Sequence, residues 1–178
     1  MITCEEIYDL HTTGALESAL CEAYREIPLD SRNSMRKNDT PLHMACAFVD
    51  ENAVRILLER GADVNVRNDD GDTPLCVLAK RKCCGKETTI AGIAGLLVSK
   101  EARVPRSGKN TTALIEAVGN RHFLMADILL MSGCRIDSTN SNGNNVLHVI
   151  CQSAGDIAYD IKRTKERIAD FSAISENV

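Results

Sequence analysis

A short motif that returns four times along the chain constrains its fold more than any other feature of the sequence. The intervals between its copies are 33, 39 and 33 residues, and the copies begin at Thr40, Thr73, Thr112 and Asn145. A second motif, Leu57 to Asn65, returns at Leu129 to Asp137 and more weakly at Leu96 to Val104, in the same phase. Periods of this length are typical of stacked repeats, whose single units cannot bury their apolar faces alone. The sequence therefore predicts an array of like units.

Each unit predicts a turn, a helix, a short loop and a second helix. Thr40 and Pro41 suit the start of a helix, because a threonine hydroxyl accepts from the free amide groups there and proline needs no donor. Gly61 and Gly133 stand where a helix stops in a left-handed residue, and the Asp-Gly pair at 70–71 suits a tight turn. We expect four leucines to begin the buried stripes of the first helices: Leu42, Leu75, Leu114 and Leu147.

The stretch Thr40 to Ala45 reads T-P-L-H-M-A, and with the period it resembles the ankyrin-repeat family. The resemblance covers roughly residues 33 to 155. It implies an all-α solenoid of stacked helix-turn-helix units with hairpin-like turns. It also implies that His43 and His148 are structural histidines that hydrogen-bond between loops, and that partners bind in a concave groove formed by turn tips and first helices.

On this basis we predict one ankyrin-repeat domain over residues 1–178. An N-terminal cap would occupy 1–34, with helices over Ile2–Leu10 and Ala15–Ile27 separated at Gly14. Repeat 1 would span 35–67, repeat 2 68–106, repeat 3 107–139 and repeat 4 with the C-terminal cap 140–171. A helix is expected over Ile157–Phe171, followed by a flexible tail at 172–178.

Composition and motifs argue against most other classes of function. Three Phe, three Tyr and no Trp leave few rings for stacking bases or sugars, and a formal net charge of −4 gives no overall attraction to nucleic acid or anionic lipid. The longest apolar run, Ile90 to Val98, is too short to span a bilayer. Motifs for catalysis, nucleotide binding and zinc are missing, and the eight cysteines read as reduced core thiols. We expect no enzyme activity, no metal and no cofactor.

Two departures from the family pattern fall in repeat 2. Cys76 stands where the family has its histidine, so the contact between the second and third units is expected to be looser. Six extra residues fall within Lys80 to Thr89, between the two helices of that unit, and bring a cluster of basic residues. The cluster is either a solvated insertion or a contact for an acidic ligand, and its adjacent Cys83 and Cys84 leave a redox role open.

The family resemblance implies the residues that face a partner. They lie at the turn tips and on the outer side of each first helix: Arg36, Lys37, Asp39, Phe48, Arg67, Asp69, Asp70, Asp72, Lys80, Arg81, Lys109, Asn120, Asn142 and Asn144. This groove would run from basic through acidic to neutral and polar. Phe48 either anchors a partner or folds back onto the neighbouring helix near Lys80 and Arg81.

We therefore expect a monomeric, non-catalytic module that binds another protein through its concave groove, as a scaffold, adaptor or inhibitor. The alternative is an adaptor for nucleic acid or an acidic ligand that uses the basic segment Lys80 to Lys86. The sequence begins without the basic and apolar regions of a signal peptide. A cytoplasmic location is the expectation, with a nuclear location or export as a host-targeted effector left open.

Overall fold

The computed structural model describes residues 2–82, 85–100, 113–137, 139–140 and 142–152. Within these residues the chain forms nine α-helices and a single isolated β-bridge, between Asn33 and Asp39. The helices are α1 (Cys4–Thr13), α2 (Glu17–Glu26), α3 (Pro41–Phe48), α4 (Glu51–Glu59), α5 (Pro74–Ala79), α6 (Glu87–Ser99), α7 (Ala113–Gly119), α8 (Phe123–Met131) and α9 (Val146–Gln152). The predicted all-α class is confirmed.

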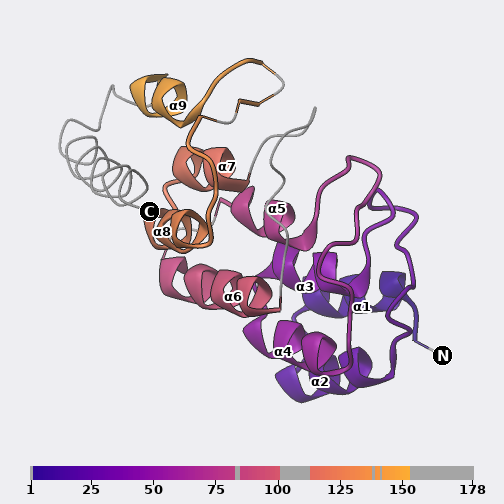
Figure 1. Ribbon diagram of the computed structural model, residues 1–178. Helices are drawn as coiled ribbons and strands as arrows, with labels where there is room; N and C mark the ends of the chain where they lie inside the picture. The colour runs from indigo at the N-terminus through magenta and orange to yellow at the C-terminus, as the bar shows by residue number, and fades with distance from the viewer. Residues whose placement is uncertain (1, 83–84, 101–112, 138, 141, 153–178) are drawn as a thin grey trace.

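The helices are arranged in two layers that follow the order of the chain (Figure 1). In one layer α1, α3, α5, α7 and α9 pack against one another in succession, and in the other α2, α4, α6 and α8 do the same. The first helix of each pair therefore always meets the first helix of the next pair. This is the stacked solenoid that the motif spacing predicts, with the four motif leucines on successive helices of one layer.

The helix boundaries lie where the local sequence favours them. Thr40 and Thr73 are the N-caps of α3 and α5, and a proline follows each of them at the first helical position. Gly61 and Gly133 have φ angles of 87° and 86°, which is the left-handed conformation that ends a helix. These predicted signals are confirmed.

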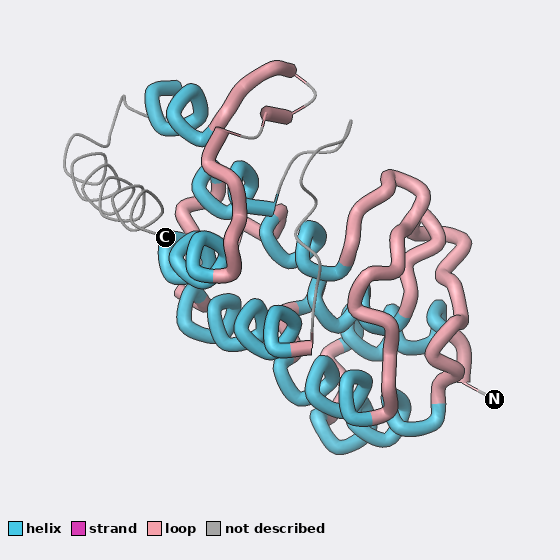
Figure 2. The backbone as a smooth tube through the Cα atoms, in the orientation of Figure 1, coloured by secondary structure: helices cyan, strands magenta, loops and turns pink. Residues whose placement is uncertain are grey.

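The long loops before α3 and α5 lie next to each other at one edge of the stack (Figure 2). We call residues 33–39 the first finger and residues 68–72 the second finger. Each closes on itself as a hairpin-like turn, because the Asn33 amide donates to the Asp39 carbonyl at 2.9 Å and the Asn68 amide donates to the Asp72 carbonyl at 3.0 Å. The Asp69 amide also donates to the Lys37 carbonyl at 2.8 Å, which joins the two fingers.

The N-terminal helix pair takes the place of a repeat at the start of the stack. Thr3 and Glu6 form a reciprocal capping box at the start of α1, so this helix begins at Cys4 rather than Ile2. Gly14 ends it with a φ angle of 73° and separates it from α2, as expected. Ile7 is fully buried, so α1 extends the core across the first pair.

The extra residues of repeat 2 are divided between a loop and a helix. Residues 80–86 connect α5 to α6, and α6 has 13 residues where α4 and α8 have nine each. The prediction placed the whole excess between the helices, and part of it instead lengthens α6.

None of the described helices is long and apolar enough to cross a membrane. Cys83, Cys84, Lys109 and the expected helix Ile157–Phe171 lie outside the described residues.

Three of the four motif leucines are in the core, and the fourth is not. Leu42, Leu75 and Leu114 are at most 1% exposed, whereas Leu147 is 46% exposed. The expectation of a buried Leu147 was wrong. Among the described residues, α3, α5 and α7 each contact a first-layer helix on both sides, and α9 contacts one on the α7 side.

This difference gives a matched test of the stack. Leu75→Ala should lower the free energy of unfolding by about 2–5 kcal/mol, because it leaves a cavity in a packed core. Leu147→Ala should cost less than about 1 kcal/mol, because the side chain is half exposed. Urea denaturation followed by circular dichroism measures both, and equal losses would contradict the exposure of α9.

Candidate functional site

A groove of about 620 Å³ lies between α1, the two fingers, α3 and α5. Its floor includes Ala47 from α3 and Val77 from α5. Polar and charged side chains from both fingers and from the end of α5 surround this floor. The residues that line the groove are Glu5, Tyr8, Asp9, Asn33, Met35, Arg36, Lys37, Asp39, Ala47, Asn68, Asp70, Asp72, Val77, Lys80 and Arg81.

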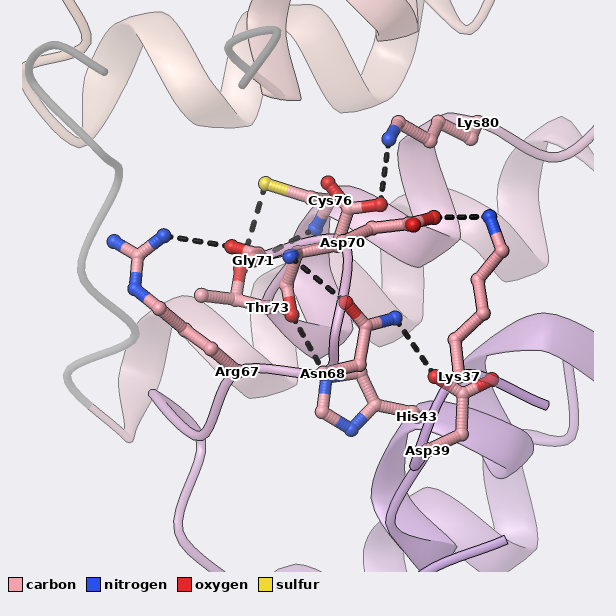
Figure 3. Close-up of polar contacts among 11 residues, drawn as sticks. Lys37, Asp39, His43, Arg67, Asn68, Asp70, Gly71, Thr73, Cys76 and Lys80 are labelled. Atoms are coloured by element: carbon pink, nitrogen blue, oxygen red, sulfur yellow. Dashed lines mark hydrogen bonds and ion pairs between the residues drawn. The ribbon is translucent and has the colours of Figure 1, made fainter. Parts of the chain in front are cut away.

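A buried histidine holds the second finger against the first repeat. His43 Nε2 donates to the Asp72 carbonyl at 2.9 Å (Figure 3). Its Nδ1 accepts from the Thr40 hydroxyl at 2.8 Å. This arrangement requires a neutral ring that carries its proton on Nε2. Burial lowers the pKa of His43, and the hydrogen bond to the Asp72 carbonyl partly opposes that shift.

Asn68 makes a second tie between the fingers. Its side-chain amide donates to Asp39 Oδ1 at 2.8 Å, and its Oδ1 accepts from the Asp72 amide at 2.9 Å (Figure 3). Asn68 and Asp39 are both buried. Because buried polar groups are stable only when hydrogen-bonded, these ties fix the position of the second finger. Asn68 was not among the residues predicted from the sequence, although its place two residues before Asp70-Gly71 marks the base of the turn.

Charged side chains at the fingertips pair with each other. Lys37 of the first finger forms an ion pair with Asp70 of the second (Figure 3), and the Asn38 amide donates to both carboxylate oxygens of Asp69, at 2.9 and 3.1 Å. Within repeat 2, Lys80 Nζ lies 2.5 Å from Asp72 Oδ2. The expected sequence of a basic patch followed by an acidic patch is therefore not formed at the first two tips, because the opposite charges lie together.

Comparison with known proteins agrees with this geometry. Residues 26–76 match the family model for ankyrin repeats in many copies. The matched residues are ankyrin repeats. It is also 34% identical, over 68 residues, to an ankyrin repeat-containing protein of Schizosaccharomyces pombe, and the match covers 34% of this chain and 33% of the relative. The chain thus spans about a third of the length of this curated relative. Ankyrin repeats are generally protein–protein interaction modules.

The ankyrin groove has a wall that the sequence analysis treated only as a cap. Glu5, Tyr8 and Asp9 of α1 line it, and the Arg36 guanidinium lies 4.8 Å from the centre of the Tyr8 ring. Met35 stands beside them on the first finger and is 86% exposed, the largest value among the described large apolar side chains. A signal was present in the sequence, because Cys4 and Ile7 mark the buried face of α1 and leave residues 5, 8 and 9 on the other face.

Phe48 follows neither of the two expectations. Its ring stacks on His11 of α1 with 4.1 Å between centroids and 8° between planes, and the Tyr8 ring is 5.6 Å away. His11 in turn lies 2.9 Å from the hydroxyl of the buried Tyr24. Burial lowers the pKa of His11, and the nearby Asp50 partly opposes this shift. Phe48 therefore joins the cap to repeat 1 and does not line the groove.

The other predicted site residues divide into two groups. Seven of them line the groove: Arg36, Lys37, Asp39, Asp70, Asp72, Lys80 and Arg81. Arg67 instead donates to the Gly71 carbonyl at 2.7 Å, and Asn120 donates to the Ala79 carbonyl at 3.0 Å. Asn142 and Asn144 belong to the last described turn, away from this groove.

The described cysteines differ in burial, and burial decides how reactive their thiols are. Cys4, Cys46 and Cys76 are buried, as expected for core thiols, whereas Cys151 is exposed. Burial raises the pKa of Cys134 to about 12 and raises that of Cys46 still further, so neither is a ready nucleophile. In the described part of the chain, no three His, Cys, Asp or Glu side chains are grouped to hold a metal ion.

The histidine ties give the fold a dependence on pH. Free histidine has a pKa near 6.5, and the pKa values of His43 and His11 are both lower than this in the folded protein. As the pH falls below 6.5 the unfolded chain takes up protons first, so the free energy of unfolding decreases until the pH reaches the folded values.

Replacement of His43 tests this. His43→Gln keeps a donor for the Asp72 carbonyl but does not titrate, so we expect a loss of about 1–2 kcal/mol at neutral pH that shrinks toward pH 5. Urea midpoints across this range measure the effect. His148→Gln, at an exposed histidine, is the control and should leave the pH profile unchanged. A gap between wild type and His43→Gln that stays constant with pH would rule out titration of His43 as the cause.

Proposed function

We propose that this chain binds an extended segment of a partner protein in the groove between α1, the fingers, α3 and α5. The observation that carries the proposal is the groove itself, with an apolar floor, a polar rim and the exposed side chain of Met35 at its edge. Its volume of about 620 Å³ is within the range of specific binding sites. Exposed apolar side chains bordered by polar residues are typical of interaction surfaces.

A rigid frame supports this interpretation. The floor is built on helices, and the fingers are held by His43 and Asn68 through buried hydrogen bonds. A groove that is already formed loses little conformational entropy when a partner enters, which favours affinity. We infer a non-catalytic role of the kind general to ankyrin repeats, in which the partner is positioned or blocked.

The alternative role for the basic segment Lys80 to Lys86 has less support. Lys80 forms an ion pair with Asp72, and the Arg81 carbonyl accepts a hydrogen bond from His122. The start of the segment is therefore held by contacts within the protein. Lys82 and Lys86 are exposed. This role stays a prediction from the sequence, and no contact within the described residues favours it over the groove.

The groove can be tested without knowing the natural partner. Peptides selected from a random displayed library on the full chain should include some that bind in the groove. Val77→Arg places a long charged side chain on the floor and should weaken their binding at least tenfold, while Met35→Ala should weaken it about threefold to tenfold through lost apolar contact. Fluorescence anisotropy measures each dissociation constant.

A matched control separates blocking from unfolding. Ala19→Arg places the same side chain on the exposed surface of α2, outside the groove, and should leave peptide binding unchanged. Circular dichroism melting curves verify that each variant is folded. Selected peptides that bind Val77→Arg as tightly as the wild type would show that the groove is not the binding site.

A further inference from the structure

The α1 end of the groove carries an excess of negative charge. Glu5 and Asp9 line this end, and among the described residues no cation forms an ion pair with either of them. Glu5 accepts from the Ser34 amide and hydroxyl at 3.3 and 3.2 Å, which favours its ionised form. Arg36 also lines the groove, and its guanidinium lies over the Tyr8 ring of α1. Two carboxylates thus face one guanidinium.

The α5 end carries the opposite excess. Lys80 is paired with Asp72, but Arg81 is not paired with any carboxylate in the described part of the chain. Its Nε atom is buried and has no hydrogen-bond acceptor. The Arg81 carbonyl accepts a hydrogen bond from His122 Nε2, which anchors the backbone of this residue beside the groove. A guanidinium binds a carboxylate with two parallel hydrogen bonds, so an acidic side chain in the groove is the natural partner for Arg81.

A second unsatisfied atom lies in the same groove. Asp72 Oδ1 is buried and has no donor, while the whole side chain is only 4% exposed. Both atoms are buried, so a ligand that brings an N–H donor and an oxygen acceptor would reach them only if these side chains shift toward it. A polypeptide has both on every residue. Phosphate groups bring acceptors only, and five carboxylates line this groove against four cations.

The middle of the groove is already neutralised by its own residues. Lys37 pairs with Asp70, and the carboxylate of Asp39 accepts from Asn68. Between the ends the partner meets the apolar floor of Ala47 and Val77. Neighbouring helices pack about 8–10 Å apart, so α1 and α5 are about 16–20 Å apart across α3. An extended chain covers that span in about five or six residues.

We propose that the two ends of the groove carry opposite charge and so give it a direction, which we call its polarity. The groove selects an extended segment with a basic residue over Glu5 and Asp9, an acidic residue over Arg81, and about four mainly apolar residues between them. This proposal rests on the proposed function, because it names the partner chemistry of the same groove. The charged ends determine which segments fit, and the apolar floor provides most of the affinity.

Charge reversal at one end at a time tests the polarity. Arg81→Glu makes both ends acidic, and Asp9→Lys makes both ends basic. A random library of ten-residue peptides is selected on the wild type and on each variant. The wild type should enrich peptides with one basic and one acidic residue five or six positions apart. The Arg81→Glu variant should enrich peptides with two basic residues, and the Asp9→Lys variant should enrich peptides with two acidic residues.

The selected peptides then provide a quantitative test. For one wild-type peptide, reversal of its acidic residue should weaken binding about fivefold to tenfold, and Arg81→Glu should reverse that preference. High salt should reduce the difference, because the ends of the groove are open to solvent. Arg25→Glu changes the charge by the same amount on the exposed side of α2 and should leave the preference unchanged.

The possible outcomes separate the two proposals. One outcome is that Val77→Arg abolishes peptide binding, but the peptides show no charge preference or show the same preference for Arg81→Glu as for the wild type. This result would overturn the polarity and leave the groove as the binding site. If no selected peptide is sensitive to Val77→Arg, the groove itself is excluded and the polarity with it. Enrichment of the three charge patterns, together with sensitivity to Val77→Arg, supports both.

Discussion

The hydrogen bond from His43 to the Asp72 carbonyl determines where the second finger lies, and the groove depends on that position. The bond exists because the ring is buried, remains neutral and has its other nitrogen engaged by Thr40. Asn68 adds a second buried tie to the first finger. With its base fixed at two points, the second finger lies beside the first, so their tips can pair. A looser finger would leave the floor of α3 and α5 without a rim.

The first helix of the chain serves the fold and the groove with opposite faces. Cys4 and Ile7 are buried against the stack. The helical repeat places Glu5, Tyr8 and Asp9 on a different face of α1, and these residues line the groove. The Phe48–His11 stack joins this helix to α3. A cap is needed because a terminal repeat has no neighbour on one side. Here the same helix also forms the acidic wall of the groove.

The sequence was sufficient for the stack but not for the side chains that meet across it. Thr40 and Gly61 act within one repeat, so local propensity places them correctly, and the repeat period places Leu42 and Leu75 on the stacked faces. Phe48, in contrast, contacts His11, which lies 37 residues earlier in a segment outside the repeat pattern. The pairing of Lys37 with Asp70 likewise depends on the distance between two loops, which no local pattern encodes. Leu147 has the same place in the motif as Leu42 and Leu75 but is 46% exposed, so the motif alone does not determine burial.

Pairing between the fingers changes what this groove can discriminate. A partner that contacts Lys37 or Asp70 must first compete with an existing ion pair, so these residues give little net selectivity. The floor of Ala47 and Val77 favours any apolar segment. Among the described residues, discrimination is therefore left to groups whose charge or hydrogen-bonding capacity is not met within the fold, such as Asp9 at one end and Arg81 at the other. Because two helix spacings separate these ends, their opposite charges act on different residues of a bound segment and give it a direction.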